Sequence, residues 1–307
     1  MLELIRPTPR ALCWTALLWL TGAGILLAGP AAEVLRWAGE MDARPEGLAC
    51  LDLDRDGTDD AVVVDARGLL LLPPAGTEQP LQRLPWPAEA PVAPAVRDPH
   101  ARVVALPPRL GGGLAVVPSA RGGYGVLREA PASLGTPALA WTLEGTAPLS
   151  SRGDHVLTGL RVAGTHQLMG LKLDDAPVRG LPGGVRATAL LRGPSDKVLL
   201  VVGSPEGVSL HDPADGRAGA LLSGVAPPLL AVDDDGDGVD ELYSALDTER
   251  GTDALMVTRL AQGRPVVERA AETGGRLVAL ARCPGGPGVV MALVQASGGW
   301  RVMEVRP

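Results

Sequence analysis

Two short clusters of acidic residues stand out in the 307-residue sequence. The first, 52–60, reads DLDRDGTDD, and the second, 233–241, reads DDDGDGVDE. Both fit the pattern D-x-D-x-D-G-x-x-D/E, in which acids at positions 1, 3 and 5 turn toward one centre when the backbone curls. The glycine at position 6 permits a sharp turn that a Cβ would obstruct. The pattern therefore predicts two loops that bind a hard cation.

The predicted ligand atoms are all oxygens. Carboxylates at positions 1, 3, 5 and 9, with the backbone carbonyl of position 7, supply about six oxygens, which suits Ca²⁺. The absence of Cys and His from the set argues against zinc or copper. The predicted ligands are Asp52, Asp54, Asp56, Thr58 and Asp60 in the first loop, and Asp233, Asp235, Asp237, Val239 and Glu241 in the second. Because crowded carboxylates repel one another, each loop is expected to be ordered only when a cation is bound.

An EF-hand begins in the same way but needs a bidentate Glu at position 12. Position 12 is Val63 in the first loop and Ser244 in the second, and the residues around it favour β-strands. The loops are therefore expected to join strands. A solvated acidic turn without a ligand is the alternative, but two similar copies, each leading into an apolar strand, favour binding.

Followed by a short apolar strand, this loop resembles the FG-GAP/VCBS repeat of integrin α-subunit propellers and many bacterial surface proteins. In that family the loop joins two strands of a propeller blade and holds calcium. The resemblance therefore implies a β-propeller with two Ca²⁺ sites. Two residues or motifs that name the family are absent here: the chain has no Phe, and it has no Gly-Ala-Pro signature.

The rest of the sequence is consistent with many short strands. Its 40 Gly and 29 Pro residues favour turns over long helices. Weaker turn-then-strand echoes occur at 95–105, 149–159, 191–203 and 281–294, and with the two acidic loops they recur about every 40–50 residues, as four-stranded blades do. We therefore expect an all-β fold over 48–307, a β-propeller of about six blades, in the range five to seven. A β-sandwich or β-solenoid is the alternative.

An apolar segment precedes the predicted propeller. Ala11–Gly29 is 19 residues long and uncharged, enough for a hydrophobic helix that crosses a membrane. Arg6 and Arg10 before it, and Glu33 after it, place the rest of the chain outside the cytoplasm.

Residues 1–32 are accordingly expected to be either an uncleaved transmembrane anchor or a signal peptide cleaved after Ala31, and 33–47 a tether. The protein would be exported. It would be anchored in a membrane and face the periplasm or the extracellular side, or it would be secreted if the signal is cleaved.

Cysteine positions leave two alternatives open. Cys13 lies in the apolar segment, whereas Cys50 and Cys283 lie near the two ends of the exported region. In an oxidising compartment these two could pair, and in a closed ring the bond would join the first unit to the last. Two buried, unpaired thiols are the alternative.

The charge distribution disfavours a nucleic-acid partner. The loops carry −4 and −6, so the remainder of a chain with net charge −7 carries about +3, and no basic stripe is visible. The acidity is concentrated in the two predicted cation sites.

Catalytic signatures are absent from the sequence. It has no H-E-x-x-H, G-x-S-x-G or P-loop motif, and its four His residues are scattered. We therefore expect a non-enzymatic binding, scaffold or adhesion module with a protein or glycan partner. The alternatives are a propeller-type enzyme acting on polysaccharide and an accessory subunit of a membrane complex.

Overall fold

Strands dominate the part of the chain that the structure describes. The computed structural model describes residues 32–51, 60–65, 67–73, 81–85, 103–116, 124–128, 138–142, 147–161, 167–246, 253–261, 263–283 and 289–306. Within these ranges the only helical elements are two short 3₁₀ turns, η1 (Pro108–Leu110) and η2 (Pro194–Asp196). The predicted all-β class is confirmed.

Four sheets each contain four antiparallel strands in chain order. The first contains β2 (Pro45–Leu51), β3 (Asp60–Asp65), β4 (Gly68–Leu71) and β5 (Gln82–Pro85). The second contains β6 (Val103–Ala105), β7 (Leu114–Val116), β8 (Tyr124–Arg128) and β9 (Ala138–Thr142). The third contains β10 (Ala147–Arg152), β11 (His155–Arg161), β12 (Leu168–Leu173) and β13 (Ala176–Pro177). The fourth contains β14 (Ala187–Arg192), β15 (Val198–Ser204), β16 (Gly207–His211) and β17 (Ala218–Leu222).

A fifth sheet has seven strands in the order β1-β23-β22-β21-β20-β19-β18. Its strands are β1 (Ala32–Gly39), β18 (Val225–Val232), β19 (Glu241–Leu246), β20 (Asp253–Ala261), β21 (Arg264–Arg282), β22 (Val290–Ala296) and β23 (Gly299–Arg306). The long strand β21 pairs with β20 up to Gly275 and with β22 from Arg276 onward. It turns at Gly274, whose φ of 61° lies in the left-handed region that glycine tolerates.

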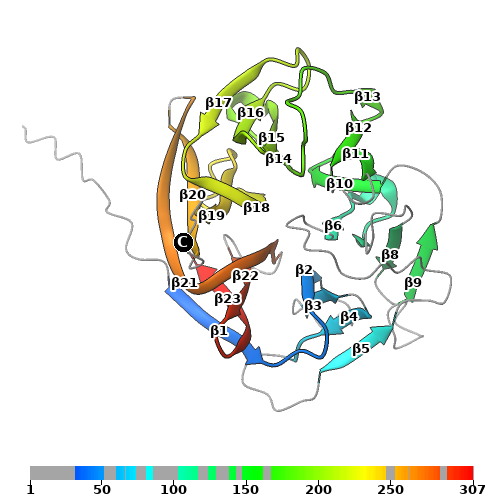
Figure 1. Ribbon diagram of the computed structural model, residues 1–307. Coiled ribbons are helices and arrows are strands. Elements are labelled where there is room, and N and C mark those ends of the chain that lie inside the picture. Colours follow the sequence, from blue (N-terminus) through cyan, green and yellow to red (C-terminus); the bar gives the residue numbers. More distant parts are fainter. Residues whose placement is uncertain are drawn as a thin grey trace, which may run out of the picture.

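The sheets follow one another around a ring (Figure 1). The innermost strands β2, β6, β10, β14, β18 and β21 each contact the next, and β21 contacts β2, which closes the circle. Each sheet therefore has a neighbouring sheet on either side of its innermost strand. In β3, for example, Val63 packs with residues of the last sheet, whereas Val62 and Val64 pack toward Leu114 of the second sheet. This explains why β3 is a continuous apolar run.

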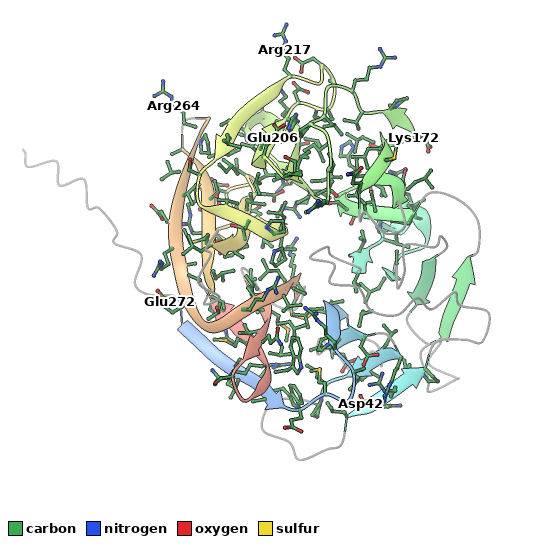
Figure 2. All side chains as sticks on the ribbon, viewed as in Figure 1. Asp42, Lys172, Glu206, Arg217, Arg264 and Glu272 are labelled. Atoms are coloured by element: carbon green, nitrogen blue, oxygen red, sulfur yellow. A yellow bond between two sulfur atoms is a disulfide. The ribbon has the colours of Figure 1, made fainter. Side chains whose placement is uncertain are left out.

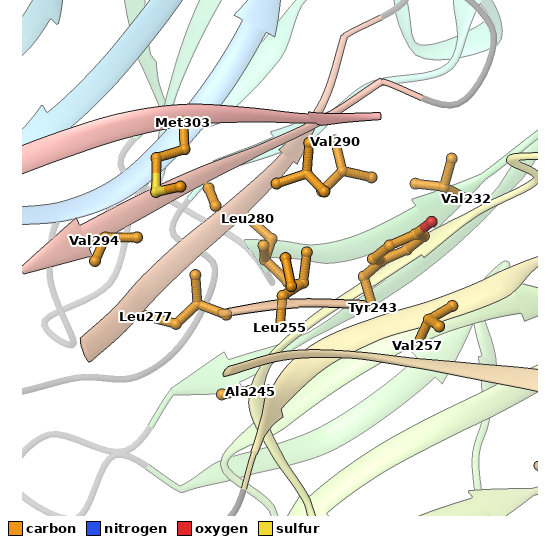
Figure 3. Packing of buried hydrophobic residues seen from close by; sticks show 13 residues of the cluster. Val232, Tyr243, Ala245, Leu255, Val257, Leu277, Leu280, Val290, Val294 and Met303 are labelled. Carbon is orange, nitrogen blue, oxygen red and sulfur yellow. The ribbon is translucent and has the colours of Figure 1, made fainter. Parts of the chain in front are cut away.

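Large side chains of the core also lie between the two halves of the seven-stranded sheet. In this layer Tyr243 of β19 and Leu255 of β20 pack against Val290 and Val294 of β22 and Met303 of β23 (Figure 3). Tyr243 is the bulkiest fully buried residue among those described. Aliphatic side chains supply most of the remaining core, as expected for a chain without Phe.

The predicted tether over 33–47 is wrong. Strand β1 occupies Ala32–Gly39 and pairs antiparallel with β23 in the register Ala32↔Arg306 to Gly39↔Trp300, and β2 starts at Pro45. The outer edge of β23 would otherwise expose a row of unpaired backbone groups. The N-terminal strand covers that edge, so the last sheet is completed by the beginning of the chain.

A disulfide also joins the two ends of the ring of innermost strands. Cys50 of β2 and Cys283, directly after β21, are bonded with their Cα atoms 4.9 Å apart and 233 positions apart in sequence. Of the two alternatives for these cysteines, the structure has the bond. It joins the first innermost strand to the last.

The predicted anchor or signal peptide over 1–32 lies, apart from its last residue, outside the described residues. Among the residues that are described, no helix has the length and apolar character needed to cross a membrane.

Candidate metal centre

The second acidic loop connects β18 to β19. Its ends are held by the pairing of Val232 with Glu241, the first residue of β19. Gly236 and Gly238 have φ values of 78° and 89°, so the two glycines make the tight turn that the sequence pattern predicts. The Asp233 carboxylate accepts the N–H of Gly236 at 2.8 Å and that of Gly238 at 3.2 Å, which shapes the curl around this side chain.

The curl brings three predicted ligands together. One carboxylate oxygen from each of Asp233, Asp235 and Asp237 lies within 4.8 Å of the others. Backbone amides orient these side chains, because Asp235 Oδ1 accepts the N–H of Asp237 at 3.0 Å and Asp237 Oδ1 accepts that of Val239 at 2.7 Å. A hard cation needs such a set of converging oxygens.

Glu241 belongs to a second, overlapping group with Asp234 and Asp235. Its side chain is buried, and its Oε2 accepts the N–H of Asp234 at 2.9 Å. Burial, together with the neighbouring Asp234, raises the pKa of Glu241 to about 8. Negative charge is therefore unfavourable here unless a positive charge compensates it.

Arginines compensate only some of these acids. Asp233 Oδ2 pairs with Arg192 at 3.0 Å. Asp234 accepts hydrogen bonds from Tyr243 and, at 3.4 Å, from Arg259. In the described part of the chain, no Lys or Arg pairs with the remaining carboxylates. These are Asp235, Asp237 and Glu241.

Asp240, at position 8, has a role that the ligand pattern does not include. Its carboxylate is fully buried and accepts two hydrogen bonds from the guanidinium of Arg152, of which the bond from Nε is 2.7 Å long. It also accepts the backbone N–H of Arg192 at 2.5 Å. The N–H of Asp240 in turn donates to the carbonyl of Arg192 at 2.7 Å. An acid at position 8 of both motifs, Asp59 and Asp240, is the signal that could have directed attention to this position.

Most of the first loop lies outside the described residues. The predicted ligands in that stretch are Asp52, Asp54, Asp56 and Thr58. Asp60 is described as the first residue of β3, where it pairs with Leu51. This register matches that of Glu241 with Val232, so position 9 closes the strand pair in the same way at both loops.

A cavity of about 290 Å³ lies at the centre of the ring, lined by residues from all six innermost strands. Its polar side chains are Ser150, Ser151, Arg152, Thr188 and Arg282. The other described lining residues are mainly aliphatic, and no Asp, Glu, His or Tyr is among them. The described wall thus lacks the groups that usually transfer protons in hydrolysis.

Comparison with known proteins identifies the class of fold. The chain matches no model of a known protein family and no curated protein. Its fold is similar to that of BBS1N, solved in complex with ARL6DN, with a TM-score of 0.51 and 16% identity over 91% of this chain and 96% of that chain.

Two structures of glucose dehydrogenase are also similar. One has a TM-score of 0.51 and 16% identity over 89% of this chain and 98% of that chain, and the other has 0.50 and 15% over 89% and 99%. At these identities the likeness concerns the fold alone. The chain is an all-β protein with a β-propeller-like fold.

Proposed function

We propose that the chain is an extracytoplasmic, membrane-associated propeller of the FG-GAP/VCBS kind that binds Ca²⁺ in two loops and acts as a non-enzymatic binding or scaffold module. The seven-stranded sheet counts as two blades, because β21 is the outer strand of one unit and the innermost strand of the next. With the four smaller sheets, this gives six blades. The N-terminal apolar segment would supply the membrane association.

The observation that carries the calcium proposal is the convergence of Asp233, Asp235 and Asp237 within 4.8 Å. Three carboxylates at this spacing repel one another, and only Asp233 has an arginine partner among the described residues. A divalent cation would remove the repulsion and would be held by oxygen ligands alone, as Ca²⁺ prefers. The same motif in the first loop supports a second site.

A structural brace is the role that this placement favours. The loop lies at the end of an innermost strand, and its residues are bonded to neighbouring blades through Arg192 and Arg152. Fixing the loop would therefore fix three adjacent blades. The loops of a rigid disc can then present a stable surface to a protein or glycan partner.

Calcium stoichiometry of the purified full chain tests the proposal. Elemental analysis after gel filtration should find two calcium ions per chain. D235N/D237N and D54N/D56N should each reduce the number to one, and D215N, which changes an acid outside both loops, should leave it at two. Absence of bound calcium in the wild type would refute the proposal.

Thermal unfolding adds a second readout. With calcium at one hundred times Kd, each occupied site should raise the free energy of unfolding of the protein by about 2.7 kcal/mol relative to its value in chelator. In chelator, D235N/D237N should unfold no earlier than the wild type, because the substitution relieves carboxylate repulsion while Asn oxygens can still accept the backbone N–H groups. A variant that is less stable than the wild type in chelator and gains as much stability from calcium as the wild type would contradict the assignment of these ligands.

A further inference from the structure

Three arginines converge on one mouth of the central cavity. Arg152, Arg192 and Arg282 are the last residues of the innermost strands β10, β14 and β21. Each of these strands leads outward into the next strand of its own blade, so their last residues lie at the same end of the ring (Figure 1). Arg152 and Arg282 also line the cavity itself.

Only two of the three guanidinium groups have a carboxylate partner among the described residues. Arg152 binds Asp240, and Arg192 binds Asp233 at 3.0 Å. For Arg282, no ion pair is present in the ranges that the structure describes. The Arg282 side chain is exposed at this mouth. Contact with the cavity wall and the nearby Arg152 lower its pKa, whereas Asp240 and Asp233 act in the opposite direction, so its charge is compensated only in part.

The cavity around Arg282 suits a small ligand. Its volume of about 290 Å³ is at the lower end of the range for small-molecule sites. Aliphatic residues such as Leu280 form most of the wall, and the hydroxyl groups of Ser150, Ser151 and Thr188 add polar positions. Such a combination of an apolar wall with a few polar groups is typical of sites that orient a ligand.

We propose that the central cavity binds a small anionic ligand whose carboxylate or phosphate group pairs with the guanidinium of Arg282. The planar guanidinium donates two parallel hydrogen bonds to either group. An anion would complete the compensation that Asp240 and Asp233 give Arg282 only in part, and the hydroxyl-bearing wall would contact the rest of the ligand. This site goes beyond the calcium-braced role, because it is formed by strands of opposite blades and needs no metal ion.

Isothermal titration of the full chain in mild detergent tests this proposal with D-glucuronate and inorganic phosphate as probes. D-glucose, which has the shape of glucuronate without its charge, is the neutral control. At least one anion should bind saturably and D-glucose should not. Each titration is run in calcium and in chelator, so that failure of the calcium proposal leaves this result readable. No saturable binding of either anion in either buffer would overturn the proposal.

Variants locate the binding in the cavity. R282Q should weaken binding of the anion about 10-fold or more, the effect of losing a charged hydrogen-bond partner. R264Q removes an arginine on the outer side of the ring (Figure 2) and should leave binding unchanged. Equal binding by R282Q and the wild type would contradict the site. If R282Q does not fold, R282K keeps the charge but loses the planar fork, and it should bind more weakly than the wild type; equal binding would again contradict the site.

Discussion

The guanidinium of Arg152 holds the fully buried carboxylate of Asp240, although the two residues are 88 positions apart in the sequence. Arg152 ends the innermost strand of the third sheet, and Asp240 immediately precedes β19. The same carboxylate accepts the backbone N–H of Arg192, which ends the innermost strand of the fourth sheet. One acidic side chain of the loop therefore joins three consecutive units.

Loss of Arg152 should strongly destabilise the ring. In R152M the Asp240 carboxylate would remain buried without its counter-charge, which costs about 3–5 kcal/mol. Urea unfolding at neutral pH measures this loss. R217M, at a site that is 86% exposed, is the matched control and should change stability by less than about 0.5 kcal/mol. An R152M variant as stable as the wild type would show that the pair does not contribute.

The Cys50–Cys283 bond should contribute to stability because it closes nearly the whole ring. Because the bond joins residues 233 positions apart, it strongly reduces the conformational entropy of the unfolded chain. C50S/C283S should therefore lose about 2–5 kcal/mol in the free energy of unfolding. Urea midpoints of the variant and the wild type, without reductant, give the difference. C13S should match the wild type. Thiol titration of the denatured chain should find one free cysteine, and a result of three would contradict the bond.

His211 should make stability pH-dependent. The residue is buried, its Nε2 lies 2.8 Å from Ser209 Oγ, and its Nδ1 has no partner among the described residues. Burial lowers the pKa of His211, so below about pH 6.5 the unfolded chain binds a proton that the folded chain does not. Stability from this group is present above that pH and is lost as the pH falls toward the folded-state pKa.

Urea unfolding between pH 7.5 and 5 compares the wild type with H211Q. The variant should be less stable at pH 7.5 and should lose less stability on acidification, since the Gln side chain does not titrate. Subtracting the free energy of unfolding of H211Q from that of the wild type at each pH removes the contributions of other titrating groups. Parallel pH profiles would show that His211 is not the source.

Gly68 should not tolerate a side chain. The glycine has a φ of 153°, and a Cβ at this position would lie 2.1 Å from the backbone oxygen of Leu84 on the adjacent strand β5. G68A should therefore separate β4 from β5 and destabilise the fold by about 1–3 kcal/mol or more. G153A is the control, because its φ of 55° is also left-handed but its Cβ would meet nothing within 4 Å. Thermal unfolding should rank G68A well below G153A, and equal losses would contradict the predicted clash.

The sequence by itself determined the local chemistry of this protein. Alternating acids and the two glycines of 233–241 suffice to predict that Asp233, Asp235 and Asp237 converge, because a tight curl is encoded within a few residues. The regular spacing of turns and apolar runs likewise predicted the all-β class. Such features depend on backbone preferences that neighbouring residues set.

Only the tertiary structure decided which distant segments meet. The sequence contains no local pattern that indicates that β1 covers the edge of β23, and for this reason 33–47 was predicted as a tether. The pairing of Asp240 with Arg152 likewise has no local signal, since 88 positions separate them. The physical reason is that an open strand edge or a buried charge can be satisfied by any compatible partner in the chain, and closure of the ring selects the partner.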